Sequence, residues 1–368
     1  MKPNKEGFDY GIFIAVLILV LGGVALVGSS SAATALEGKH NWAYYMTRQI
    51  VWAIAGIFGA IYFFRLSDEK LRKQVPFLIY GSIFLLFLTL VPKIGINVNN
   101  ASRWIGVKHT LFVIQPYEFV KMAYVIFLAD LFGNTEIKMK DKIIKSFIIT
   151  IVICGILAKQ PDLGGAIIIC SIYVITLLIA GISFLWLIPV GTVAIIALTL
   201  YIRMSKNKSG RMQAWLDPWK DAANTGYHTI QSMIAVGSGG LFGTGFSQGK
   251  QKNLFLDMPH TDYIFSTIAE ELGFVGAFTV IGIFIFFMWK GVLVAMHIKE
   301  KKQKYLAALI TFLIMSQVFI NIGVATGLLP AKGTTLPFIS AGGSALVVNI
   351  MCVGLLLALS KKAVGKAE

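Results

Sequence analysis

The chain has 368 residues, of which 56% are hydrophobic and only 14% are charged. Soluble domains carry about 25% charged residues, so this composition excludes a soluble enzyme, a disulfide scaffold and a disordered chain. The three cysteines all lie in apolar runs and have no metal-binding spacing. The net charge of +15 would suit a nucleic-acid-binding protein, but the positions of the basic residues decide that question.

Apolar runs bounded by charged residues, glycine and proline predict about ten transmembrane helices. We therefore expect an all-α integral membrane protein with one polytopic domain over residues 1–368. A large loop, 203–261, lies between the seventh and eighth helices, and a loop of this length is usually functional or disordered. The predicted spans are 10–32, 49–64, 76–91, 112–133, 144–159, 163–181, 184–202, 262–289, 305–328 and 335–360.

The basic residues predict the orientation of the chain. One set of alternating short segments, which includes both termini, contains eighteen Lys and Arg residues, and the opposite set contains seven. Short cytoplasmic loops carry the excess of Lys and Arg, so we expect both termini in the cytoplasm and the 203–261 loop outside. The basic surplus is then mostly a topology signal, and no nucleic-acid partner is expected.

Ionisable residues in membrane segments are costly and by default suggest function. At the outer start of the fourth span, Pro116 suits the first helical position, which puts Glu118 and Lys121 on one face within pairing distance. A purely structural ion pair is an equally good interpretation. Asp162 begins the sixth span in a similar way, where it is either part of an anion-binding helix end or only a first-turn carboxylate.

Two further polar sites lie on the same predicted side. Asp262 sits where the outer loop becomes the eighth span and is either a catalytic carboxylate or a helix cap, whereas Glu270 and Glu271 favour structural roles. The segment 327–343 contains two prolines and four glycines, which predict a broken or re-entrant loop around Lys332. Such backbone is tolerated at membrane depth only when protein or a wet cavity surrounds it.

Several polar and glycine-rich motifs follow one another along the chain. They are Ala101–Ile105, Gln115-Pro116 with Glu118 and Lys121, Gln160-Pro161-Asp162, Leu216–Trp219, Gly226-Tyr227 with Gln231-Ser232, Gly237–Gly243, His260-Thr261-Asp262, Glu270–Gly273 and 327–343. In this order, the motifs resemble those of the SEDS family (shape, elongation, division and sporulation), integral membrane peptidoglycan glycosyltransferases, over essentially the whole chain. Within the family, the segment 326–333 is more similar to the FtsW branch than to RodA. Tyr117 departs from the serine usual at its position.

The resemblance implies polymerisation of lipid II, a disaccharide-pentapeptide on undecaprenyl pyrophosphate, outside the bacterial cytoplasmic membrane. Asp262 is then the catalytic general base, which deprotonates the acceptor hydroxyl for a single inverting displacement. The other expected substrate-binding residues are Arg103, Glu118, Lys121, Asp162, His260, Thr261, Lys332 and Ser340.

The resemblance also implies a class B penicillin-binding protein and other divisome or elongasome membrane proteins as partners. A divalent cation, Mg²⁺ or Mn²⁺, would help the pyrophosphate leave, but no ligand set is evident and the question stays open. Two alternatives to the enzyme remain, a flippase for lipid-linked precursors and a non-catalytic division scaffold. A flippase should place charges along a continuous path through the membrane.

Overall fold

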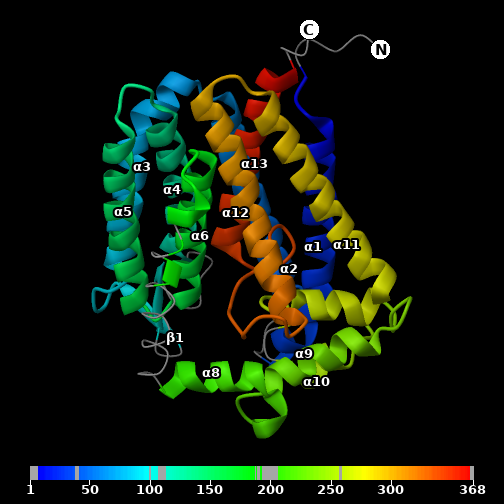
Figure 1. Ribbon diagram of the computed structural model, residues 1–368. Helices are drawn as coiled ribbons and strands as arrows, with labels where there is room; N and C mark the ends of the chain where they lie inside the picture. Colours follow the sequence, from blue (N-terminus) through cyan, green and yellow to red (C-terminus); the bar gives the residue numbers. More distant parts are fainter. Residues whose placement is uncertain are drawn as a thin grey trace.

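The chain folds into a bundle of long helices that run between two levels (Figure 1). The computed structural model describes residues 7–37, 41–98, 101–106, 113–186, 188, 191–192, 206–256 and 259–364. The helices before the long loop are α1 (Tyr10–Glu37), α2 (Tyr44–Arg65), α3 (Asp68–Leu88), α4 (Pro116–Gly133), α5 (Met139–Lys159) and α6 (Leu163–Ile179). The helices after it are α11 (Ile264–His297), α12 (Lys301–Ala325) and α13 (Gly343–Val364).

Six of the described helices, α1, α2, α3, α11, α12 and α13, are long and apolar enough to cross a membrane. The predicted fourth, fifth and sixth spans are helices α4, α5 and α6, which pack into the same bundle: α4 contacts α3 and α12, and α5 contacts α6. The prediction of a helical multi-pass membrane protein is confirmed. Most of the predicted seventh span, 184–202, lies outside the described residues.

Several helix limits differ from the predicted spans, and the starts of α3 and α13 have a clear physical cause. Helix α3 begins at Asp68, eight residues before the predicted span, because the hydroxyl of Ser67 accepts a hydrogen bond from the Lys70 amide and caps the charged first turn. Helix α13 begins at Gly343, whereas the predicted span began at 335. Residues 335–342 instead belong to the broken segment, which the sequence had predicted separately.

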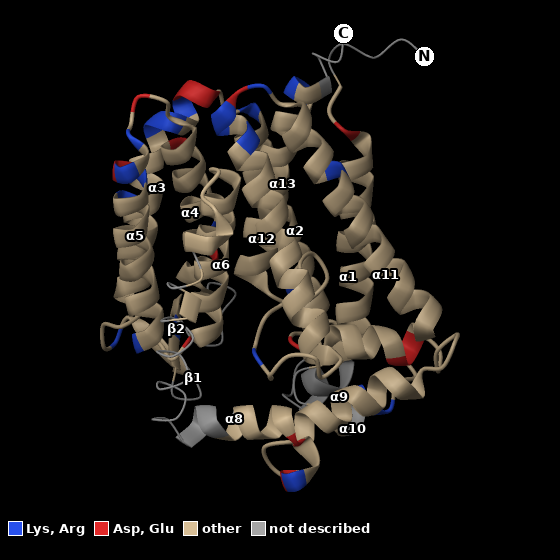
Figure 2. Cartoon of the chain, viewed as in Figure 1, with Lys and Arg blue, Asp and Glu red and all other residues tan. Residues whose placement is uncertain are grey.

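Charged side chains gather at one end of the bundle, where α1 begins and α13 ends (Figure 2). The connections from α2 to α3, from α4 to α5 and from α11 to α12 all lie at this end. The basic segments 65–74, 138–145 and 290–304 lie in these connections and in the helix ends beside them. The fold therefore brings together at one end the basic residues of these segments, which the charge distribution along the sequence had placed on one side of the membrane.

The opposite end has a small antiparallel sheet that the all-α prediction did not include. Its strands are β1 (Gly95–Val98), β2 (Ala101–Gly106) and β3 (Val113–Ile114), in the order β1-β2-β3. Gly95 pairs with Ile105 at the start of the first ladder, and Ile105 pairs with Ile114 in the second. The strands are too short for a clear alternating pattern, and they carry Arg103 toward the ends of α4 and α6.

The described part of the long loop is helical. It contains α8 (Lys206–Leu216), the 3-10 turn η1 (Pro218–Asp221), α9 (Tyr227–Ser238) and α10 (Gln251–Leu254). Figure 1 shows α8, α9 and α10 extending across the end of the bundle that also carries β1. The loop is therefore a structured layer that packs on α1, α11 and α12.

Helix α11 is broken at Gly273, whose φ of 67° and ψ of −165° are non-helical. The break frees backbone groups, and the turn that follows α9 satisfies them. The amides of Phe274 and Val275 donate to the carbonyls of Gly240 and Leu241 at 2.8 and 3.1 Å. A Cβ at position 273 would lie 2.3 Å from the Gly243 nitrogen, so glycine is required there for both conformation and space.

We expect Gly273→Ala to lower the free energy of unfolding by about 1–3 kcal/mol, because alanine resists positive φ and would push the 240–243 turn away. Thermal unfolding of the purified protein in detergent, followed by size-exclusion chromatography, measures the change. The matched control is Gly282→Ala in the same helix, where nothing lies within 4 Å of the added Cβ. Equal effects of the two substitutions would contradict the argument.

Candidate functional site

Glu118 and Lys121 form the predicted ion pair. Helix α4 begins with Pro116 at its first position, so Glu118 lies in the first turn and Lys121 one turn further. Glu118 Oε2 lies 2.8 Å from Lys121 Nζ, and both side chains are buried. At this depth the ammonium requires a partner, and the pair provides it.

Lys121 is also the centre of a polar network between α4, α12 and α13. Its Nζ donates to Gln317 Oε1 at 2.8 Å and lies 5.0 Å from the centre of the Tyr117 ring. Gln317 in turn donates to Asn349 Oδ1 at 3.3 Å. The Tyr117 hydroxyl donates to the Gly165 carbonyl at 3.2 Å, so the unusual tyrosine joins this network to the start of α6.

The start of α6 attracts two cations. Asp162 caps the helix by accepting a hydrogen bond from the Gly165 amide at 3.0 Å. Lys332 Nζ donates to the Gly164 carbonyl at 2.6 Å, and Arg103 Nη2 donates to the Pro161 carbonyl at 2.9 Å. Burial lowers the pKa of Lys332 to about 8, although the charge of Asp162 opposes the shift.

The motif 260–262 packs against the broken segment that precedes α13. The Thr261 carbonyl accepts a hydrogen bond from Ser340 Oγ at 2.7 Å, and the His260 carbonyl accepts one from the Ala341 amide at 2.8 Å. His260 is buried, its ring centre lies 4.5 Å from that of Tyr45, and burial lowers its pKa to about 4. Its imidazole is therefore neutral at neutral pH.

The second half of the broken segment, 334–340, is largely buried in protein, whereas 327–333 is partly or fully exposed. Leu336, Phe338 and Ile339 are each only 1% exposed. The side-chain amide of Gln49 on α2 donates to the Ser340 carbonyl at 3.1 Å. These contacts fix the segment between helices from distant parts of the chain.

Two adjacent residues of this segment, Lys332 and Gly333, connect the start of α6 to the predicted catalytic residue Asp262. Lys332 reaches the start of α6, and a Cβ on Gly333 would lie 3.0 Å from Asp262 Oδ2. The Asp262 carboxylate, on a partly exposed residue, therefore lies directly against the backbone next to Lys332. The structure thus brings together Lys332, Asp162, Arg103 and the Glu118–Lys121 pair, and Gly333 joins this cluster to Asp262.

Helix α12 contributes two polar residues that the sequence analysis missed. Asn321 Nδ2 donates to the carbonyls of Asp262 and Thr334, at 3.0 and 2.7 Å. Gln317 binds Lys121 and lies four residues earlier, so both project from one face of α12, about one turn apart. Uncharged amides spaced by four in an apolar run were the available signal, but the cost of burial singles out ionisable residues more strongly.

A pocket of about 150 Å³ lies beside this site. Its lining residues come from α2, from the 260–262 motif and from the start of α13: Tyr45, Arg48, Gln49, Trp52, His260, Thr261, Ala341, Gly342 and Gly343. Within the described residues, no three His, Cys, Asp or Glu side chains are grouped closely enough to suggest a metal site. The polar lining of the pocket includes the side chains of Arg48, Gln49 and Thr261.

These features define a polytopic membrane protein with a charged site at one end of its helix bundle, covered by a broken helical segment. The chain belongs to the FtsW, RodA and SpoVE family: the family model described as "Cell cycle protein" matches residues 10–364.

Relatives from other bacteria align over nearly the full chain. A protein of Trichlorobacter lovleyi named "Probable peptidoglycan glycosyltransferase FtsW" is 34% identical, and the alignment covers 98% of this chain and 95% of that protein. Stage V sporulation protein E of Bacillus subtilis is also 34% identical, with 98% and 99% of the two chains covered.

Solved structures share the fold. A chain from a study titled "Structural coordination of polymerization and crosslinking by a peptidoglycan synthase complex" superposes with a TM-score of 0.79 at 27% identity, covering 97% of this chain and 98% of the other. The rod shape determining protein RodA of Thermus thermophilus gives a TM-score of 0.71 at 26% identity, with 96% of each chain covered. Family and fold thus agree.

We expect Lys121→Met to lower the free energy of unfolding by about 3–5 kcal/mol, because it leaves Glu118 buried without its counter-charge. The double variant Lys121→Met/Glu118→Gln leaves no buried charge unpaired, so its free energy of unfolding should fall by less. Thermal unfolding in detergent measures both.

The control for this series is Lys73→Met, which breaks a 2.7 Å pair with Glu69 whose side chains are about three-quarters exposed. Exposed pairs contribute about 0–1 kcal/mol, so little change is expected. If the single and double variants at Glu118 and Lys121 lost the same stability, burial of an unpaired charge would not be the cause.

Proposed function

We propose that this protein polymerises lipid II into glycan strands, with Asp262 as the general base. The observation that carries the proposal is the contact between adjacent elements of the site: Gly333 lies against the Asp262 carboxylate, while Lys332 extends to the start of α6. The segment that carries the Lys332 cation thus also touches the Asp262 carboxylate, an arrangement that suits a reaction between a sugar hydroxyl and a diphosphate-linked donor.

In the proposed reaction, the acceptor hydroxyl loses its proton to Asp262 and its oxygen bonds to the anomeric carbon of the donor. The bond from that carbon to the pyrophosphate oxygen breaks, and the leaving diphosphate takes the electron pair. One displacement inverts the anomeric centre, so one base is sufficient and no glycosyl-enzyme forms. Asp262 is partly exposed, which leaves its surroundings accessible to substrate.

The cations are proposed to bind the diphosphate. Lys332 and Arg103 both donate to backbone carbonyls at the start of α6, and Lys121 lies behind them in its network. Positive charge placed before the reaction stabilises the negative charge that develops on the leaving group. Glu118 and Asp162 orient Lys121 and α6, and His260, Thr261 and Ser340 shape the wall beside Asp262.

We also propose that the site faces outward from the cytoplasmic membrane and that both termini are cytoplasmic. The concentration of Lys and Arg at the opposite end of the bundle supports this orientation (Figure 2). A class B penicillin-binding protein is the proposed partner, together with other divisome or elongasome proteins. The likeness to a chain from a peptidoglycan synthase complex supports that choice.

The decisive experiment compares wild-type protein with Asp262→Asn on labelled lipid II, with gel analysis of the products. We expect glycan chains from the wild type and a loss of at least about a hundredfold in the variant, since the general base is removed. Equal polymerisation by both would exclude Asp262 as the base. Movement of lipid II across vesicles without polymer would instead favour a flippase.

Lys332 should make substrate affinity depend on pH. With a pKa of about 8 it is charged below that pH and loses its charge above it, so its attraction for the diphosphate weakens as pH rises. We expect the KM for lipid II to rise severalfold between about pH 7 and about pH 9, measured from initial polymerisation rates.

Two substitutions isolate the Lys332 contribution to this rise. Lys332→Arg keeps its charge throughout the range and should show a flat KM. Lys332→Met should have a raised KM already at the lower pH, with no further rise. A pH dependence that persists in the methionine variant would assign it to another group.

A further inference from the structure

The helical segment that follows Asp262 is short and is held at its far end. Only the nine residues Ile264–Leu272 lie between the start of α11 and the break at Gly273. Nine helical residues span about 13 Å. Asp262 precedes this short segment, and Glu270 and Glu271 end it.

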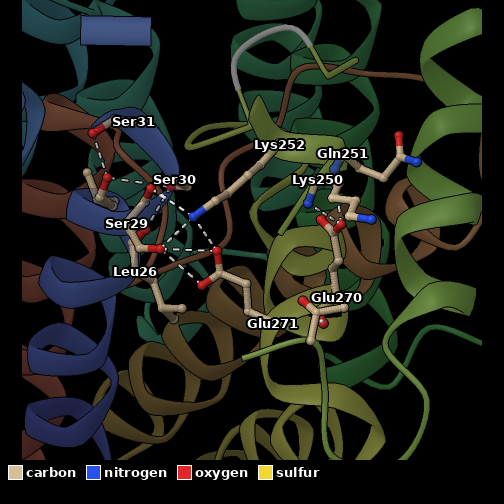
Figure 3. Close-up of polar contacts among 11 residues, drawn as sticks. Leu26, Ser29, Ser30, Ser31, Lys250, Gln251, Lys252, Glu270 and Glu271 are labelled. Atoms are coloured by element: carbon tan, nitrogen blue, oxygen red, sulfur yellow. Dashed lines mark hydrogen bonds and ion pairs between the residues drawn. The ribbon is translucent and has the colours of Figure 1, made fainter. Parts of the chain in front are cut away.

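Glu271 is held by a buried ion pair with Lys252 of α10 (Figure 3). The two side chains are 0% and 1% exposed. Ser29 of α1 donates from its hydroxyl to both Glu271 oxygens, at 3.1 and 3.0 Å. Lys252 Nζ also lies 3.0 Å from the Ser29 carbonyl and 2.7 Å from its hydroxyl, so three separate elements meet at one charge pair.

Glu270 holds the other side of the same segment end. Its Oε1 accepts hydrogen bonds from the backbone amides of Lys250 and Gln251, at 2.7 and 3.0 Å, where α10 begins (Figure 3). The Glu270 and Glu271 carbonyls accept from the amides of Thr244 and Gly245, at 2.9 and 3.1 Å. The segment end is thus attached to the layer 240–254 through side chains and backbone.

The Asp262 end has different anchors. It is held by Asn321, Ser340 and Ala341, through hydrogen bonds to the carbonyls of residues 262, 261 and 260. In the middle, the hydroxyls of Ser266 and Ser232 lie 2.6 Å apart, and Ser232 donates to the Ala325 carbonyl at 2.7 Å. A rigid segment with anchors at both ends transmits a displacement of one end to the other.

We propose that Lys252 and Glu271 are positioning residues for the reaction, which set the place of Asp262 through the short helix that separates them. The inference rests on the proposed role of Asp262. A buried ion pair is weak evidence of added stability, because well-packed apolar replacements are often as stable. What this pair supplies is a directional link between α1, α10 and α11 that apolar groups do not reproduce.

The test measures kcat and KM for lipid II polymerisation by Lys252→Met, Glu271→Gln and the double variant Lys252→Met/Glu271→Gln. Rates are normalised to monodisperse protein. Because a misplacement of about 1 Å costs on the order of a hundredfold, we expect kcat to fall ten- to a hundredfold with KM changed less than about twofold. The double variant has no unpaired buried charge and should fold, yet its kcat should stay low.

The matched control is the double variant Asp9→Asn/Lys290→Met. It removes a 3.2 Å ion pair between Lys290 of α11 and the residue just before α1, at the other end of these helices, and should leave kcat unchanged. Recovery of wild-type kcat in Lys252→Met/Glu271→Gln would overturn the proposal, since charge neutrality alone would then suffice. So would an equal loss of kcat in the control.

A second readout does not depend on activity. With Cys154, Cys170 and Cys352 replaced by alanine, an Asp262→Cys thiol is labelled with a water-soluble maleimide, with and without Lys252→Met/Glu271→Gln. We expect the labelling rate to change severalfold, and an unchanged rate would overturn the proposal. If Asp262→Asn proved fully active, the role of Asp262 would fail separately, and the labelling result would still report whether the pair moves this position.

Discussion

The cost of burying charge in an apolar bundle shapes this protein. Each buried charge requires a partner, which lies either on the same helix or on an element far away in sequence. Glu118 neutralises Lys121 within α4, the Gln317 side chain of α12 accepts a hydrogen bond from the same ammonium, and Glu271 of α11 neutralises Lys252 of α10. These pairs fix how α1, α4, α10, α11 and α12 meet, and the site forms at the places where they meet.

Broken helices are the second consequence. A break in an apolar environment exposes backbone groups that must find new partners. At Gly273 the turn 240–245 supplies them, and in the segment before α13 the carbonyls of residues 334 and 340 accept from Asn321 and Gln49. One break touches Asp262 through Gly333, and the other ends the short helical segment that follows Asp262. Irregular backbone and the polar site therefore occur together for a physical reason, since a break whose backbone groups are satisfied can bring polar groups into the bundle.

The sequence predicted the parts governed by strong, local signals. Long apolar runs predicted the helices, Pro116 with Glu118 and Lys121 predicted the ion pair, and the prolines and glycines of 327–343 predicted the break. Features that depend on contacts between residues far apart in sequence could not be predicted in this way. Nothing in the local sequence pairs Lys252 with Glu271, the strands around Arg103 are too short to show a period, and the role of Asn321 depends on two carbonyls that only the fold brings near it.

The way Asp262 is held shows how the proposed general base can be both fixed and accessible. Its backbone carbonyl accepts the Asn321 amide, and its two predecessors are bound through their carbonyls as well. These main-chain anchors help to fix the position of the residue, which stays partly exposed. Complete burial would raise the free energy of the ionised carboxylate, so that less of it would be deprotonated near neutral pH. It would also keep the substrate hydroxyl out of reach of the carboxylate. Attachment through the backbone, with glycine as the neighbour at position 333, satisfies both requirements.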